Sequence, residues 1–203
     1  MIISLGQVCT VRHNFDHDAP SLLFDWIVTD LKTVQSIFQL NNVDEAKKYF
    51  EKMEYDPSSV TDCAKFTHTD DALISVHDVK SHNDKEFLVE RLVRRYERLL
   101  DTLRTEPHIL VHFVSELWDL PQPSADISAQ SIIDLIHLKT GQPHKLVMIH
   151  HTTPPDETHK DILHLQSGTY VKDNCTISSE DYWKYEHLQW EDIYHDVIAW
   201  AGV

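Results

Sequence analysis

Cys9 is the residue whose type and position point most clearly to chemistry, because it follows an apolar run and a glycine in the opening stretch MIISLGQVC. The run at residues 1–5 is typical of a buried strand that ends at Gly6. A helix or tight turn predicted to begin near Cys9 would stabilise the thiolate through its unpaired N–H groups, helped by the charge of Arg12, and could hold an oxyanion. Free cysteine is also a common core residue, so the alternative is that Cys9 fills space behind the strand.

Other polar residues with chemical potential also stand directly after apolar runs. They are His77 and Asp78 after LISV, Ser115 and Glu116 after LVHFV, and His150 and His151 after LVMI. A thiol, imidazoles and carboxylates are the groups that acyl transfer through a cysteine needs. If the sheet is mostly parallel, the carboxyl ends of these strands meet at one edge and bring the groups together.

The elements that must position these residues follow from the apolar periodicity. Strands are predicted at 1–5, 63–69, 72–79, 108–114, 144–151 and, more weakly, 162–166, and helices at 30–40, 43–53, 83–106, 129–141, 180–188 and 190–202. Because long helices separate the strands, we expect mostly parallel pairing. The predicted fold is a layered α/β domain over residues 1–203, with a central, mostly parallel sheet of about four or five strands flanked by helices. Sites in such sheets form beyond the carboxyl ends of the strands.

Local signals refine two of these helices. Asn42 and Asn83 are each placed as an N-cap, and Glu86 follows Asn83 at the spacing of a capping box. The helix at 83–106 also carries a basic cluster among acidic neighbours, which we interpret as a solvated face rather than an anion site. The cluster consists of Arg91, Arg94, Arg95 and Arg98.

The charge balance restricts the partners. With 33 acidic and 18 basic residues, the formal net charge is −15, which repels nucleic acid and anionic lipid surfaces. No stretch approaches the roughly 20 apolar residues of a membrane span, and the opening residues lack a basic leader and a signal-length apolar run. The 3 cysteines form no disulfide framework. We therefore predict a cytoplasmic protein that binds neither nucleic acid nor membrane.

Three short motifs together resemble a known family. The motifs are SLGQVC at 4–9, FDW at 24–26 and VHD at 76–78, and they resemble a family of bacterial and giant-virus proteins described as papain-like cysteine peptidases. The resemblance implies Cys9 as nucleophile, His77 as base, and Asp25 or Asp78 as the carboxylate that orients the imidazole. Gln7, Arg12 and Trp26 are further candidates for oxyanion or substrate binding. The resemblance also implies a papain-like α+β fold as the alternative to α/β, and a host cytosol if the source is viral.

The expected reaction passes through a thioester on the cysteine. Water as acceptor would make the protein a peptidase or amidase, and an amine, for example on an amino sugar, would make it an acyltransferase. The substrate would be a small molecule or a peptide, with a donor such as acetyl-CoA. We expect no tightly bound cofactor. A fusion or partner domain is a further possibility.

Alternative functions rest on other residues. The 15 histidines include His13 and His17, which are four apart with Asp16 and Asp18 adjacent, as well as the pair at 150–151, and these are candidates for a metal-dependent enzyme. Asp192 and His195 resemble the dyad of an SGNH-like hydrolase, with Cys9 or Thr10 as nucleophile. A third alternative is a non-catalytic interaction module built on Trp183, Trp190 and Trp200, for which core packing is the simpler explanation.

Overall fold

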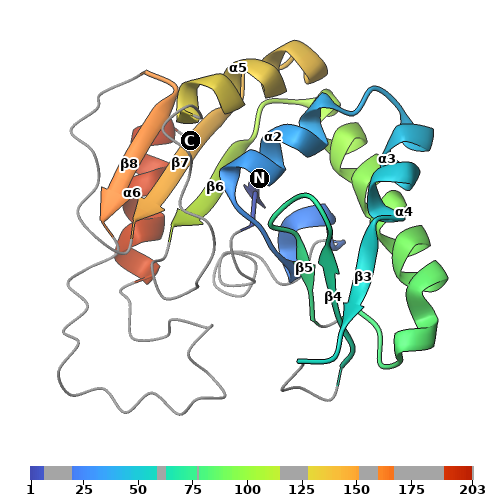
Figure 1. The fold of residues 1–203 in the computed structure, drawn as a ribbon. Helices are drawn as coiled ribbons and strands as arrows, with labels where there is room; N and C mark the ends of the chain where they lie inside the picture. Colours follow the sequence, from blue (N-terminus) through green and yellow to red (C-terminus); the bar gives the residue numbers. More distant parts are fainter. Residues whose placement is uncertain are drawn as a thin grey trace, which may run out of the picture.

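The protein has two sheets and five α-helices among the residues that the computed structural model describes, which are 1–6, 20–58, 63–76, 78–114, 128–150, 160–166 and 190–202 (Figure 1). In chain order the elements, with η for 3-10 helices, are β1 (Ile2–Ser4), η1 (Leu23–Trp26), β2 (Ile27–Val28), α2 (Leu31–Gln39), α3 (Val43–Phe50), β3 (Met53–Asp56), β4 (Lys65–His68), β5 (Ile74–Ser75), η2 (His82–Asp84), α4 (Lys85–Thr105), β6 (Ile109–Val114), α5 (Ala129–Thr140), β7 (Lys145–His150), β8 (Ile162–Gln166) and α6 (Trp190–Ala201).

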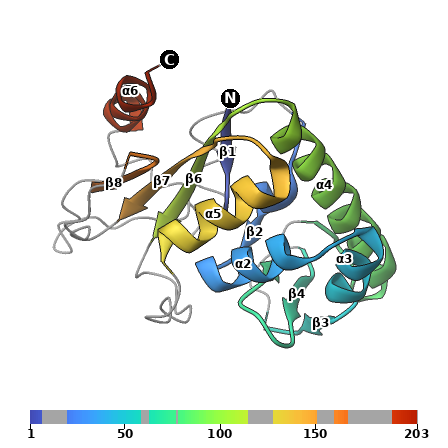
Figure 2. The same ribbon diagram turned by 90° about the horizontal axis from the view of Figure 1, so that it is seen from above.

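The larger structural unit is a parallel sheet of four strands in the order β1-β6-β7-β8. Figure 2 shows α5 on one face of this sheet and α6 on the other. The apolar runs of β6 and β7 are buried on both faces, which is typical of parallel strands covered by helices. This arrangement confirms the predicted α/β fold and favours it over the α+β alternative.

The second sheet is antiparallel, with the order β2-β5-β4-β3, and the sequence did not predict it. Its strand β3 begins where the helix predicted at 43–53 was expected to end. The apolar period runs on through Phe50 to Met53, but α3 ends at Phe50 and the chain turns before Met53 pairs with His68. Met53 is fully buried at the start of β3, and an apolar residue at this position also fits a longer helix, so periodicity alone could not place the boundary.

One hydrophobic core joins the two sheets. Side chains from β1, β6 and β7 pack in the same buried cluster as side chains from η1, β3 and β4, together with the inner faces of α2, α3, α4 and α5. The largest fully buried members are Tyr96, Phe24, Phe38, Phe50 and Phe66. A separate cluster lies between the other face of the parallel sheet and α6, where Trp190 is buried. The core interpretation of Trp190 is therefore confirmed.

The two predicted N-caps behave differently. Asn42 caps α3, because its Oδ1 accepts a hydrogen bond from the Glu45 N–H at 2.9 Å. The cap predicted at Asn83 is wrong: Ser81 caps the short η2 by accepting from the Asn83 N–H at 3.1 Å, and α4 begins only at Lys85. Within the described part of the chain, no helix combines the length and apolar character needed to cross a membrane.

Candidate functional site

The chain leaves β1 through a peptide unit whose two polar atoms are both bonded to side chains. The carbonyl oxygen of Leu5 accepts a hydrogen bond from Nδ1 of His112 at 3.2 Å, and the N–H of Gly6 donates to the Ser4 hydroxyl at 3.1 Å. The N–H of Leu5 donates to the Val111 carbonyl at 2.8 Å, which extends the pairing of β1 with β6. The direction of the chain at the start of the SLGQVC motif is thereby set by neighbouring elements.

Gly6 lies against the segment that carries the FDW motif. Its φ angle is +90°, a conformation that favours glycine. A Cβ atom added to Gly6 would lie 2.3 Å from Cγ2 of Thr29 and 3.7 Å from Cδ1 of Phe24. Thr29 and Phe24 are fully buried. The absence of a side chain at position 6 therefore allows the end of β1 to pack directly on this segment.

The FDW motif forms η1 and leads into β2. Asp25 is buried, and its Oδ2 accepts a hydrogen bond from the Leu22 N–H at 2.7 Å, which stabilises the start of η1. Trp26 is half-buried and its Nε1 donates to the Ser21 hydroxyl at 3.1 Å. Strand β2 then pairs with β5, with Ile27 opposite Ser75. The FDW segment thus lies beside the segment that leads to the VHD motif.

Asp78 of the VHD motif is held in a buried ion pair. Its Oδ1 lies 2.7 Å from Nη1 of Arg95 and 3.3 Å from Nη1 of Arg91, and its Oδ2 accepts a hydrogen bond from the Ser75 hydroxyl at 2.9 Å. The Asp78 backbone carbonyl also accepts from Arg91. The side chain of Asp78 is only 2% exposed.

These contacts correct two expectations. The basic face of α4 is not a solvated face: Arg91 and Arg95 bind Asp78, and Arg98 donates to the Ser21 carbonyl at 2.8 Å, whereas Arg94 is exposed. The expectation that Asp78 stands at the carboxyl edge of the parallel sheet is also wrong, because β5 belongs to the antiparallel sheet.

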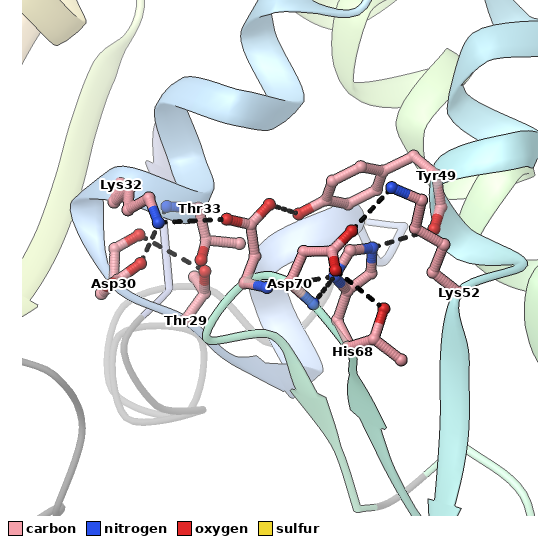
Figure 3. A network of polar contacts seen from close by, with 10 residues as sticks. Thr29, Asp30, Lys32, Thr33, Tyr49, Lys52, His68 and Asp70 are labelled. Atoms are coloured by element: carbon pink, nitrogen blue, oxygen red, sulfur yellow. Dashed lines mark hydrogen bonds and ion pairs between the residues drawn. The ribbon is translucent and has the colours of Figure 1, made fainter.

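The turn between β4 and β5 is fixed to α2 and α3 by a network of polar contacts (Figure 3). Asp71 in this turn accepts a hydrogen bond from the Tyr49 hydroxyl at 2.7 Å and lies 3.9 Å from Nζ of Lys32. The His68 ring donates through Nε2 to the Tyr49 carbonyl at 3.0 Å, while its Nδ1 accepts from the backbone N–H groups of Asp70 and Asp71 at 3.1 and 3.2 Å. The network ties the β4–β5 turn, and so the start of β5, to α2 and α3.

Three histidines lie on one face of the parallel sheet toward its carboxyl end. They are His112 on β6, His150 on β7 and His164 on β8. Nε2 of His150 lies 2.9 Å from Nδ1 of His164. Burial lowers the pKa of His112 to about 4. Burial, and then the nearby rings of His164 and His112, lower the pKa of His150 to about 4. Both rings are therefore neutral at pH 7. Since Nδ1 of His112 donates to Leu5, the lone pair of that ring is on Nε2.

Sequence reasoning did not single out His112 or His164. A signal was present, because a polar residue that interrupts the apolar runs ILVHFV and ILHLQ must share a sheet face with its second neighbours along the strand. The runs were interpreted as strands, but their histidines were not compared with the residues after the strand ends.

Several predicted residues lie outside the described residues, namely Cys9, His77, Gln7, Arg12, Thr10, His13, Asp16, His17, Asp18, Ser115, Glu116, His151 and Trp183. Asp192 and His195 of the SGNH-like alternative are both exposed on α6. Across the part of the chain that the structure describes, no group of three or more histidine, cysteine, aspartate or glutamate side chains could hold a metal ion.

The geometry brings together segments that are far apart in the sequence. Gly6 contacts the FDW segment, and β2 pairs that segment with β5, which precedes the VHD motif. No family model, curated protein or solved structure matches the chain. Interpretation of the site therefore rests on its own chemistry.

Proposed function

We propose that this protein catalyses acyl transfer through a thioester on Cys9, with His77 as the base. The observation that supports the proposal is that the segments carrying the three motifs meet where the two sheets adjoin. We call this region the junction: there Gly6 packs on Thr29, and β2 pairs with β5. Three peptide units join Gly6 to Cys9, a covalent span of at most about 11 Å. His77 is bonded directly to Val76 and Asp78, and Asp78 is tied to β5 by the hydrogen bond from the Ser75 hydroxyl at 2.9 Å.

The reaction has two steps, acylation of the cysteine and transfer of the acyl group to the acceptor. The imidazole takes the thiol proton, and the thiolate attacks the acyl carbonyl carbon, so that a C–S bond forms and the bond to the leaving group breaks. The leaving group takes the proton back from the imidazolium. Water or an amine then attacks the thioester carbon and gives its proton to the imidazole, and the sulfur leaves. The resemblance of the motifs to papain-like cysteine peptidases supports this assignment.

The surroundings suit this chemistry. Asp25 is buried beside the junction and is a candidate to orient the base, with Trp26, Gln7 and Arg12 as candidates for oxyanion or substrate contacts. The substrate is a small molecule or peptide, with a donor such as acetyl-CoA, and the protein acts in the cytoplasm, where a thiol stays reduced.

The direct test is the reactivity of Cys9. A variant with Cys63→Ser and Cys175→Ser leaves Cys9 as the sole thiol, and a matched variant retains only Cys63, which is half-buried. At pH 6 we expect iodoacetamide to alkylate Cys9 far faster than Cys63, and the His77→Ala change to remove the difference. Equal and slow alkylation of both thiols would refute the enzyme proposal.

A second experiment identifies the acceptor. The sole-thiol protein is incubated with acetyl-CoA or an activated ester, and the peptide that contains Cys9 is examined by mass spectrometry for an acyl group that hydroxylamine removes. Free acid as the final product indicates a hydrolase. An acylated amine, formed only when an amino sugar is added, indicates an acyltransferase. A protein that never acquires the acyl group contradicts the thioester step.

A further inference from the structure

A second cluster of histidines lies at the amino edge of the parallel sheet, where β6 and β7 begin. His108 directly precedes β6, His144 directly precedes β7, and His137 is in the last turn of α5. The ring centroids of His108 and His144 are 5.9 Å apart, and those of His137 and His144 are 6.1 Å apart. His108 and His144 are buried and His137 is half-buried. The turns that enter two neighbouring strands therefore meet through imidazole rings.

The hydrogen bonds of His144 require a neutral ring. Its Nδ1 accepts from the His108 backbone N–H at 3.0 Å, so the ring hydrogen is on Nε2, which donates to the Thr140 hydroxyl at 3.0 Å. A second proton would have to bind Nδ1, where it would face the His108 N–H, so protonation breaks this bond between the two turns. Burial, and then the rings of His108 and His137, lower the pKa of His144 to about 4, although the Leu103 carbonyl raises it.

The ring of His108 also excludes a second proton. Its Nε2 donates to the Thr102 carbonyl at 3.0 Å, which leaves the lone pair on Nδ1. Nδ1 is buried and has no hydrogen-bond partner among the described residues, so a proton there would create a buried charge without a partner. Burial lowers the pKa of His108, as does the Met1 ammonium group, against the Thr102 carbonyl and the Glu106 carboxylate, which raise it.

Backbone groups of the same residues complete the connection between the turns. The Lys145 N–H donates to the His108 carbonyl at 3.0 Å, and Nε2 of His137 donates to the His144 carbonyl at 2.8 Å. The ammonium group of Lys145 is bonded to the Ala201 carbonyl of α6 at 2.8 Å. Each of the three histidines thus contributes a hydrogen bond that holds the amino edge closed.

We propose that His108, His137 and His144 form an acid-sensitive latch, which joins the two turns at neutral pH and lets the amino edge open locally when the rings take up protons. Opening separates the His108 N–H from the ring of His144, and the Lys145 N–H from the His108 carbonyl, while β6 and β7 stay paired. The inference is independent of the proposed function, since Cys9 takes no part in the latch.

The test measures amide hydrogen exchange of His108 and Lys145 by NMR at pH 7 and pH 5. Division by the exchange rate of an unstructured chain at the same pH gives protection factors that are free of the intrinsic pH dependence. A ring whose pKa is near 6.5 in the open state and about 4 in the closed state should make these factors fall by about tenfold or more over this range. Carboxylates of ordinary pKa stay ionised at pH 5, so the fall reports on histidines.

Two variants identify the ring responsible. In His144→Asn, the side-chain oxygen can still accept from the His108 N–H but does not titrate in this range, so the fall in protection should shrink by about tenfold. The matched control is His112→Gln, which removes another buried histidine with a pKa of about 4. His112 stays buried in a local opening, so the control should leave the pH dependence at the edge unchanged and reduce it only for amides that exchange by global unfolding.

A second substitution at the edge keeps the test decisive if His144→Asn does not fold. His108→Gln supplies a side-chain N–H for the Thr102 carbonyl without a titrating ring, and it should also reduce the fall in protection. In the unaltered protein, nitrogen-15 NMR of the imidazoles at pH 7 should show His144 protonated on Nε2 alone.

Three results would overturn the latch. Equal effects of His144→Asn and His112→Gln on the edge amides would show that this edge opens only when the whole fold unfolds. Protection factors that do not differ between pH 7 and pH 5, or a fall that persists in both edge variants, would show that the rings do not control the opening. A His144 ring that titrates near pH 6.5 in the folded protein would show that the closed edge accepts the proton.

Discussion

Substitution of Gly6 by alanine should destabilise the protein more than the same change at any other glycine with a described conformation. Two costs add at this position. A residue with a Cβ pays about 1–2 kcal/mol in a left-handed conformation, and the φ angle here is +90°. The new Cβ would also meet Cγ2 of Thr29 at 2.3 Å, and overpacking of a buried site typically costs about 1–3 kcal/mol. We therefore expect the free energy of unfolding to fall by about 2–5 kcal/mol.

Two matched variants separate these costs. Gly141 has a φ angle of +73° with no atom within 4 Å of an added Cβ, so Gly141→Ala should lose only the conformational part, about 1–2 kcal/mol. Thr29→Ser removes the clashing methyl group and keeps the hydroxyl, which bonds the Asp30 carbonyl at 3.4 Å. In the double variant with Gly6→Ala, it should recover about 1–3 kcal/mol.

The assay is equilibrium unfolding in urea, followed by far-UV circular dichroism and by tryptophan fluorescence so that two probes test for a single transition. A cycle of the four proteins, wild type, Gly6→Ala, Thr29→Ser and the double variant, gives the coupling energy. If Gly6→Ala is no worse than Gly141→Ala, or if the coupling is absent, then β1 does not pack on the FDW segment as described, and the junction on which the site depends is wrong.

Three further predictions concern stability. Histidine in the unfolded chain takes up a proton near pH 6.5, whereas burial lowers the pKa of His112 and His150 to about 4, so the free energy of unfolding should decrease as the pH falls between these two values. The His112→Gln variant should lose up to about 3 kcal/mol of this pH dependence, measured as the difference between urea midpoints at pH 7 and pH 4.5. An unchanged pH dependence would contradict the burial of a neutral His112 ring. Tyr49→Phe removes the hydrogen bond to Asp71 and should lower the free energy of unfolding by about 1–2 kcal/mol in the same urea assay. The control Tyr55→Phe, at an exposed position, should lower it by less than about 0.5 kcal/mol, and equal losses would show that the Tyr49–Asp71 bond does not stabilise the fold. Asn42→Ala should lower the free energy of unfolding by about 1 kcal/mol because the α3 cap is lost, while Asn83→Ala should leave it nearly unchanged. A larger loss for Asn83→Ala than for Asn42→Ala would support the N-cap at Asn83 that the sequence predicts.

The parallel sheet could be predicted because its inner strands carry a strong signal. Residues 109–114 are apolar except for His112, and residues 146–149 are continuously apolar. Between these two runs lies α5, which is capped at Ser128 and ends at Gly141. Such runs are typical of strands buried on both faces. The antiparallel sheet lacks such a signal. Strands β2 and β5 have two residues each, and their pairing depends on tertiary contacts that no local pattern records.

The arginines of α4 show why the site was harder to predict than the fold. A row of basic residues has the same pattern whether it faces water or a buried carboxylate, because the pattern carries no information about the partner. One clue was available in the spacing. Arg95 falls between Leu92 and Leu99, in line with Leu88 and Leu103, and so occupies the apolar stripe of the helix. A charged residue in a buried stripe requires a buried counter-charge, and the search for one would have led to Asp78.

The exit of the chain from β1 and the joining of the two sheets are one structural feature. The peptide unit between Leu5 and Gly6 is held by the hydroxyl of Ser4 within β1 and by the ring of His112 on β6, and Gly6 packs on Thr29, which follows β2 of the other sheet. Because three separate elements constrain one peptide unit, loosening any of the contacts changes the direction in which the chain leaves the sheet. Substitutions that weaken the contact between the sheets should therefore reduce the reactivity of the predicted nucleophile even when they lie far from it in sequence, since the segment that carries Cys9 starts at this peptide.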